Sequence, residues 1–290
     1  MGAGGVGALK LGVALRLGRV SNLPTVWTNA LAGATLAADG VPSLWVVLLV
    51  GLALTLFYEG GMWLNDAFDA EIDAKERADR PIPNGETSRS TVFIGGWTFL
   101  TVGLIVALLV SPEAGFVGLL LTGAIVLYDW LHKRTVLSPV IMGATRFLSY
   151  GLAAVAMASF SGPALWGALG LFAYIIGLTY AAKQEAYDRL GASWPLGVLA
   201  IPVLYAFVQG FEFPLAFLFW LGFAGVVGFA LHRLFRRSAG DVPVAVVTMI
   251  AGVCLYDATL IAGTGSFALA CLAALGFLLT LRLQKIASGT

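Results

Sequence analysis

Apolar segments of roughly membrane-spanning length recur along almost the whole of this 290-residue chain. A helix of about 20 apolar residues crosses the hydrocarbon core of a bilayer, which is ~30 Å thick. Because 59% of the residues are hydrophobic and only 11% are charged, a soluble domain could not solvate the surface. The chain is therefore predicted to be an all-α membrane protein. The predicted spans are 20–38, 43–65, 91–110, 114–131, 139–160, 163–183, 194–210, 213–232, 242–263 and 266–284.

Basic residues fall on alternate links between these spans. Links such as KERADR, HKR and RLFRR carry Lys and Arg. The other five links have neither, and they lie near Gly40, Ser111, Ser161, Gly210 and Gly263. By the positive-inside rule, the basic side is the cytoplasm, and both termini are predicted to lie there. Residues 1–19 mix apolar and basic side chains and are predicted to form a helix on the membrane surface.

An acidic cluster begins where the second predicted span ends. Asp66, Asp69 and Asp73 are spaced i, i+3, i+7, so they share one face if the helix continues past the span. Three carboxylates on one face repel each other unless a cation neutralises them. Oxygen ligands of this kind suit Mg²⁺, which also shares substrate phosphates, and Asn65 adds an amide beside them. The cluster is predicted to bind metal; a solvated loop with salt bridges is the alternative interpretation.

Two arginines and a deeper acid flank the cluster. Arg77 and Arg80 could hold phosphate oxygens bidentately, and the prolines of RPIPNG then end the helix. Glu59 precedes Asp66 by seven residues, so it points the same way about 10 Å deeper along the axis. An ionisable group at that depth is costly and usually faces a cavity or a partner. We interpret Glu59 as an acceptor-side or proton-handling residue, or as a hydrogen-bond partner between helices.

A second acidic pair follows the sixth predicted span. Glu185 and Asp188 have i, i+3 spacing at a helix end. Tyr180 and Lys183 accompany them, Tyr180 as a candidate for the acceptor cavity and Lys183 as a candidate for phosphate binding. Both acidic groups lie on the same predicted membrane side. Two Mg²⁺ ions that bridge a diphosphate would need both groups of acids, so the pair is a candidate second metal site.

Basic residues between the two acidic groups are candidates for phosphate binding. Lys133 lies at the cytoplasmic end of the fourth predicted span. Arg146 lies inside the fifth span, where an unpaired guanidinium is expensive. His132 could belong to a metal site, although a lone His is more often an interfacial residue. The net charge of +1 gives no indication of a nucleic-acid partner.

The sequence NDAFDAEIDAKERADRPIP resembles the first aspartate-rich signature of the UbiA superfamily of intramembrane prenyltransferases. RVSNLPTVWTNALAG resembles the first span of that family, and YDWLHKR resembles its Tyr-x-x-x-x-Lys-Arg element. The resemblance covers nearly the whole chain, so residues 1–290 are expected to form a single prenyltransferase domain. Eight residues match the first signature: Asn65, Asp66, Asp69, Asp73, Arg77, Arg80, Pro81 and Pro83.

The resemblance implies a helical bundle around a central cavity open to lipid, with the aspartate-rich motifs on the cytoplasmic side. Members of the family usually have nine spans, so nine to ten are expected. Two Mg²⁺ ions would hold an isoprenyl diphosphate, whose prenyl group passes to a lipophilic acceptor, here expected to be aromatic. The second motif departs from the family, because Gln184 stands near where an aspartate is often found. The chain looks like a divergent bacterial member, which implies the bacterial inner membrane.

Two other functions stay open from the sequence. A terpene cyclase of the same superfamily would ionise the prenyl diphosphate without an acceptor. A lipid or small-molecule transporter is compatible with the acids Glu59 and Asp257 inside predicted spans. However, transporter sites tend to lie near the bilayer midplane, whereas the acids of this chain gather at one face. No motif accounts for Asp257.

Overall fold

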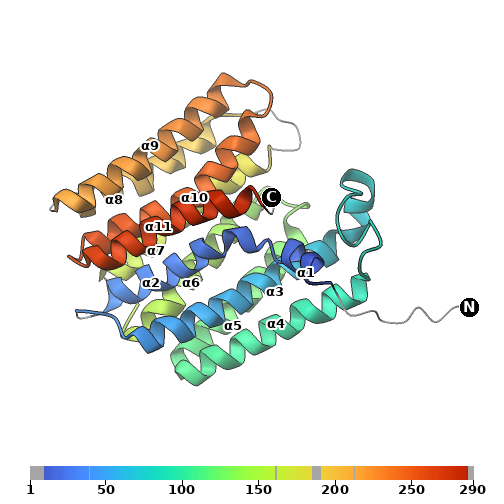
Figure 1. Cartoon of the computed structure of the whole chain (residues 1–290), viewed down its shortest axis with the longest axis horizontal. Coiled ribbons are helices and arrows are strands. Elements are labelled where there is room, and N and C mark those ends of the chain that lie inside the picture. Colours follow the sequence, from blue (N-terminus) through green and yellow to red (C-terminus); the bar gives the residue numbers. More distant parts are fainter. Residues whose placement is uncertain (1–9, 39, 161, 185–190, 212, 287–290) are drawn as a thin grey trace, which may run out of the picture.

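The computed structural model describes residues 10–38, 40–160, 162–184, 191–211 and 213–286. Within these ranges the chain forms helices and their connections, and the helices lie side by side in an elongated bundle (Figure 1). The elements are α1 (Leu11–Leu17), η1 (Val20–Asn22), α2 (Leu23–Ala37), α3 (Leu44–Glu76), α4 (Arg89–Val110), α5 (Pro112–Leu131), α6 (Ser138–Met157), α7 (Gly162–Ala182), η3 (Trp194–Leu199), α8 (Ala200–Gly210), α9 (Pro214–Arg236), α10 (Asp241–Ala262) and α11 (Phe267–Gln284).

All ten predicted spans are helical, although two of them are short. Eight helices among the described residues are long and apolar enough to cross a membrane, namely α3 to α7 and α9 to α11. The predicted span 20–38 is divided between η1 and the 15-residue α2, and the predicted span 194–210 is divided between η3 and α8. Pro195 and Pro202 donate no backbone hydrogen bond, which limits regular α-helix in the divided segment. These helix lengths are those of an integral membrane protein.

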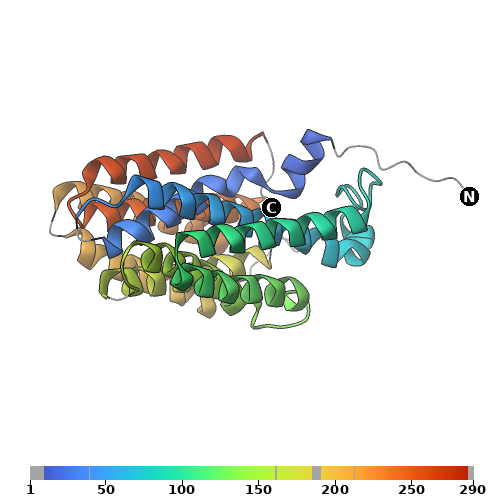
Figure 2. The ribbon, with the colours of Figure 1, turned by 90° about the horizontal axis from the view of Figure 1, so that it is seen from below.

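Large apolar side chains cover the outer faces of the peripheral helices. Leu109 in α4, Phe116 in α5 and Leu218 in α9 expose 78%, 63% and 59% of their surface. Such faces would aggregate in water, whereas lipid tails cover them without cost. By contrast, α7 and α10 are the most buried of the spans and form the middle of the bundle. Figure 2 shows α11, in red, on the opposite face of the bundle from α5, in green.

The short helix α2 connects the two sides of the bundle. It packs against α3 and α6 on one side and against α7, α10 and α11 on the other. The part of the predicted surface helix that the structure describes is α1, and Val13 and Leu17 of α1 are buried against Trp63 of α3 and Val92 of α4. The N-terminal segment is therefore docked onto α3 and α4 through its apolar side.

Two glycines allow α3 and α4 to approach each other closely. A Cβ atom added at Gly60 would lie 2.7 Å from Leu100 Cδ2 and 3.0 Å from the carbonyl oxygen of Gly96. A Cβ atom at Gly96 would lie 3.1 Å from the carbonyl oxygen of Gly60. Small residues at a helix crossing let the backbones meet, as is common between membrane helices. This contact fixes the position of the helix that carries the first acidic cluster.

The helix α3 is longer than a single membrane crossing needs. Its 33 residues span ~50 Å, compared with a hydrocarbon core of ~30 Å. Its C-terminal end and the connection that follows project beyond the neighbouring helices, at the end of the bundle where α1 lies (Figure 1). The acidic residues are therefore carried on a helical extension of a membrane span.

Candidate active site

Three aspartates of α3 form the centre of the candidate site. Because α3 continues to Glu76, Asp66, Asp69 and Asp73 lie on one helical face, as the spacing predicted. They expose only 5%, 6% and 2% of their surface. Carboxylates are rarely buried unless they are paired with another group, and a solvated loop would leave them exposed. The burial favours the interpretation as a binding site over that of a solvated loop.

Cationic side chains from three different segments surround these carboxylates. Arg80, from the connection after α3, lies 2.5 Å from Asp66 Oδ1 and 3.5 Å from Asp73 Oδ2. Lys133, from the end of α5, lies 3.1 Å from Asp69 Oδ2 and 3.3 Å from Asp73 Oδ1. The predicted phosphate-binding residues Arg80 and Lys133 are thus brought directly to the predicted metal-binding residues.

Arg19 is a member of the site that was expected from the sequence only as the last residue of the surface helix. It lies between α1 and η1 in a left-handed backbone conformation, with φ 43°. Its NH2 group donates to Asp66 Oδ1 at 3.0 Å and to Asn65 Oδ1 at 3.3 Å. The only signal in the sequence was its position directly before the first span, which does not show that the segment folds back onto α3.

Asp129 and His132, near the end of α5, complete the cluster. Asn65 Nδ2 donates to Asp129 Oδ1 at 3.2 Å, and His132 Nε2 lies 3.1 Å from Asp69 Oδ2. The other carboxylate oxygen of Asp129 is buried without a hydrogen-bond partner in the described residues. Asp129 was not among the predicted site residues, although its i, i+3 spacing to His132 places both residues on one face.

The donor set fits a hard divalent cation such as Mg²⁺. Asn65, Asp66, Asp69 and Asp73 present oxygen atoms, and Asp129, which accepts from Asn65, has a second oxygen without a partner among the described residues. Within the described ranges, no three His, Cys, Asp or Glu side chains are arranged as a complete metal site. Mg²⁺ usually binds through one or two carboxylates and takes its other ligands from water and substrate phosphates, so an open set of this kind is suitable.

The second predicted acidic group can be located only in part. Glu185 and Asp188 lie outside the described residues. Lys183 Nζ donates to Ser138 Oγ at 2.8 Å and to the carbonyl oxygens of Thr135 and His132 at 3.1 Å and 3.3 Å. It therefore fastens the end of α7 to the connection between α5 and α6, next to the first cluster. Burial lowers the pKa of Lys183 below its ordinary value.

Four other predicted residues lie apart from the carboxylates. Arg77 is exposed and forms no ion pair with the described residues. The Tyr180 hydroxyl donates to the carbonyl oxygen of Ala192 at 2.6 Å. Glu59 lies against Gly18, at the end of α1, and its Oε1 atom is buried without a partner among the described residues. Arg146 belongs to a separate network inside the bundle.

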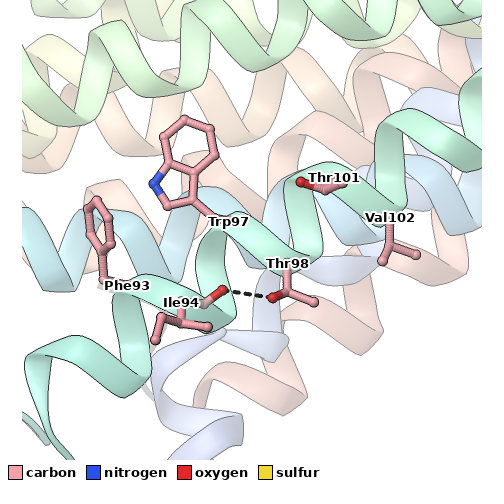
Figure 3. Close-up of a pocket in the computed structure, with 6 residues that line it drawn as sticks. All are labelled: Phe93, Ile94, Trp97, Thr98, Thr101 and Val102. Atoms are coloured by element: carbon pink, nitrogen blue, oxygen red, sulfur yellow. Dashed lines mark hydrogen bonds between the residues drawn. The ribbon is translucent and has the colours of Figure 1, made fainter.

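Two hollows lie on the outer surface near α4. One, of about 400 Å³, is lined by Phe93, Ile94, Trp97, Thr98, Thr101 and Val102 (Figure 3). The second, of about 470 Å³, is lined by Phe68, Arg89, Ser90, Phe93 and Ile94. Both present mainly apolar side chains to the outside, as contact with lipid tails requires. Neither is lined by the aspartates, and the central cavity open to lipid stays a prediction.

An all-helical membrane bundle with buried carboxylates at one end agrees with the architecture that the sequence resemblance implies. The chain belongs to the UbiA prenyltransferase family, whose model matches residues 26–241. It is 29% identical to a digeranylgeranylglyceryl phosphate synthase of Methanopyrus kandleri over 202 residues. The matched segment covers 67% of this chain and 73% of that protein. Further proteins with this name are matched over 37% to 61% of their own length.

Solved structures share the fold. A UbiA homologue from Aeropyrum pernix superposes with a TM-score of 0.67 at 18% identity, over 84% of this chain and 97% of that one. A UbiA homologue from Archaeoglobus fulgidus, bound to GPP and Mg²⁺, superposes with a TM-score of 0.54 at 15% identity, over 93% and 99%. The predicted fold class is confirmed, and the chain is a prenyltransferase.

Proposed function

We propose that this chain transfers a prenyl group from an isoprenyl diphosphate to a lipophilic acceptor within the membrane, with Mg²⁺ bound at the α3 carboxylates. The observation that carries the proposal is the burial of Asp66, Asp69 and Asp73 on one helical face, beside Arg80 and Lys133. The GPP and Mg²⁺ held by the Archaeoglobus fulgidus homologue support it. We further propose that residues 1–290 form a single prenyltransferase domain.

Asp66, Asp69 and Asp73 would hold Mg²⁺, and Asn65 would supply an amide oxygen. We propose two ions, with Glu185 and Asp188 as ligands on the second side. When bound, Mg²⁺ neutralises the charge that builds up on the diphosphate as the allylic bond breaks. The contribution of Asp129 would be to hold the amide group of Asn65, which keeps Asn65 Oδ1 turned toward Arg19, the residue that also contacts Asp66.

Basic residues would bind the diphosphate oxygens that the metal leaves free. Arg80 and Lys133 already lie on the carboxylates, so they can donate to a diphosphate bound there without large movement. Lys183 lies within 3.3 Å of the backbone of His132 and is the next cation along the same end of the bundle. Arg77 is exposed at the end of α3 and would reach the site from the side of the solvent.

The acceptor that we propose is a lipid carrying glyceryl phosphate. The support comes from the relatives, which are named digeranylgeranylglyceryl phosphate synthases. The aromatic acceptor expected from the sequence remains the second candidate. For either acceptor, Glu59 and Tyr180 stay proposals as acceptor-side residues, and Glu59 has the stronger claim because its buried carboxylate oxygen lacks a described partner.

The test is prenyl transfer by the purified chain in nanodiscs. GPP and Mg²⁺ are supplied with geranylgeranylglyceryl phosphate or with 4-hydroxybenzoate, and products are identified by mass spectrometry. We expect a prenylated acceptor together with released diphosphate. A cyclic hydrocarbon formed without an acceptor would instead favour a terpene cyclase. Movement of a labelled lipid by an Asp66→Ala variant would favour a transporter.

Loss of one cation should weaken donor binding selectively. Lys133→Gln is expected to raise the KM for GPP by about 10- to 100-fold, the usual effect of a lost hydrogen bond to a charged group. The matched control is Arg134→Gln, because Arg134 is the exposed neighbour and forms no ion pair with the described residues. Steady-state kinetics of diphosphate release measure both. Equal effects of the two changes would refute a specific role for Lys133.

We propose that the carboxylate end of the bundle faces the cytoplasm of a bacterial cell, with both termini on that side. Cysteines placed at Asp79, after α3, and at Val41, before α3, report on opposite ends of that helix. In a Cys271→Ser background, a membrane-impermeant maleimide added to intact spheroplasts should label Val41→Cys and spare Asp79→Cys. The reverse labelling would invert the proposed orientation.

A further inference from the structure

A chain of buried polar groups crosses the middle of the bundle. Arg146 of α6 donates from NH1 to Asn29 Oδ1 at 2.8 Å and from NH2 to Thr25 Oγ1 at 3.2 Å. The amide of Asn29 in α2 then donates to Asp257 Oδ2 in α10 at 2.8 Å. The hydroxyl group of Tyr150 donates to the other carboxylate oxygen of Asp257. The network thus links a cation and an anion through one amide, and it includes the acid that no motif explained.

Arg146 differs from the cations of the carboxylate cluster because it has no direct anionic partner. Arg19, Arg80 and Lys133 each lie within 4 Å of a carboxylate, whereas among the described residues no carboxylate lies that close to Arg146. Asp257 is separated from it by Asn29, and both oxygens of Asp257 are already hydrogen-bonded. The guanidinium therefore keeps donors to spare in an environment where an unpaired charge is costly.

The surroundings of Arg146 leave it accessible while its supports are fixed. Asn29, Tyr150 and Asp257 have no exposed surface, whereas Arg146 is only partly buried. Its guanidinium carbon lies 6.0 Å from the centre of the Tyr58 ring. The two hydrogen bonds and the ring hold the guanidinium plane in one orientation, which favours recognition of an anion by the remaining N–H groups.

Tyr58 relates this position to the carboxylate cluster. It precedes Asp66 by eight residues on α3, which corresponds to ~12 Å along the helix axis. The Tyr58 hydroxyl donates to the carbonyl oxygen of Arg19 at 3.2 Å, and the Arg19 guanidinium contacts Asp66. Arg146 consequently lies on the membrane side of the cluster. A diphosphate held by Asp66, Asp69 and Asp73 would meet first the cations that already contact these carboxylates, namely Arg19, Arg80 and Lys133.

We propose that Arg146 binds the anionic group of the acceptor, a phosphate or a carboxylate, and that Asn29 and Asp257 hold it in position. This inference rests on the proposed function, since it assigns the charge class of the acceptor for that reaction. With its anionic group at Arg146, the acceptor would lie on the membrane side of the carboxylate cluster. Its nucleophilic hydroxyl group would face the diphosphate bound at that cluster. Asp257 compensates the charge of Arg146 through Asn29 while the acceptor is absent.

Binding of matched charged and uncharged probes tests the proposal. The chain in nanodiscs is titrated by calorimetry with geranylglyceryl phosphate and geranylglycerol, and with 4-hydroxybenzoate and phenol, against empty nanodiscs. Donor and Mg²⁺ are left out. Separate titrations with GPP and Mg²⁺ measure donor binding. The variants are Arg146→Gln and Arg146→Lys, and the matched control is Arg282→Gln, which removes an exposed positive charge at the end of α11.

The wild type is expected to bind the charged member of at least one pair at least tenfold more tightly than its uncharged counterpart. Arg146→Gln should weaken that charged probe by about 10- to 100-fold and leave the uncharged probe and GPP unchanged. Arg146→Lys, which keeps the charge but not the planar fork, should lose less affinity and again only for the charged probe. If Arg146→Gln does not fold, the titrations of Arg146→Lys test the proposal instead. Arg282→Gln should bind like the wild type.

Two results would overturn the proposal. If the wild type binds neither charged probe more tightly than its uncharged counterpart, the protein has no anion subsite for the acceptor. An Arg146 variant that loses GPP affinity as strongly as probe affinity would place Arg146 in the donor site. The probes are titrated without donor or Mg²⁺, so their binding can be measured even if the chain transfers no prenyl group. The proposal of an anion subsite at Arg146 and the proposal of prenyl transfer can therefore be refuted separately.

Discussion

Asp66→Asn and Asp69→Asn are each expected to lower Mg²⁺-dependent diphosphate release by ~10²–10³-fold or more, the effect of removing one group that stabilises developing charge. Each change keeps the side-chain size and removes a carboxylate that the structure buries between cations. Diphosphate release from GPP by the protein in nanodiscs, with and without EDTA, is the measurement. The wild type in EDTA should match the variants.

The control for this experiment is Asp79→Asn. Asp79 lies in the connection after α3, is exposed, and forms no ion pair with the described residues. Its change should leave diphosphate release within twofold of the wild type. Thermal unfolding of all the variants establishes that they are folded. Full activity of Asp66→Asn, or full activity of the wild type in EDTA, would remove the basis for metal binding at these carboxylates.

Gly60→Val is expected to destabilise the bundle more than any single change at the site. The new side chain would meet both Leu100 and the backbone of Gly96, so α3 and α4 must move apart. Overpacking of a well-packed core usually costs about 1–3 kcal/mol, and contact with a backbone atom places this change at the upper end of that range. Unfolding in mixed micelles should show the loss directly.

The matched control for Gly60→Val is Gly123→Val. Gly123 lies in a membrane-spanning helix, α5, and a Cβ atom added there meets no atom within 4 Å. Gly123→Val therefore makes the same change of residue type in a membrane helix as Gly60→Val, but without a steric clash. Because α3 carries the carboxylates, Gly60→Val should also lower diphosphate release in the fraction that stays folded. Equal stability of the two variants would show that the α3–α4 crossing tolerates a larger separation.

Helical periodicity was sufficient to locate the membrane helices and the acidic face of α3. The spacing of Asp66, Asp69 and Asp73 requires only that one helix continues, and it does so to Glu76. The lengths of α2 and α8 were overestimated, since apolar composition does not report where a segment changes from 3-10 helix to α-helix. Hydropathy therefore predicts that a segment is apolar more reliably than it predicts the extent of its helix.

Contacts between distant segments could not be predicted in the same way. Arg19 reaches Asp66 across 47 positions and Asn29 reaches Asp257 across 228, so no local pattern relates them. Glu59 shows a further limit: its spacing to Asp66 was correct, but the end of α1 packs against its carboxylate. A periodic pattern gives the direction of a side chain, whereas tertiary packing decides what that side chain meets.

The end of α11 meets the short segment η1 beside the candidate site. Gln284, the last residue of α11, donates to Asn22 Oδ1 at 2.9 Å, and Asn22 lies three residues after Arg19. The final described helix therefore braces the segment that delivers Arg19 to the carboxylates, so that α11 stabilises the site without contributing a side chain to the carboxylate cluster.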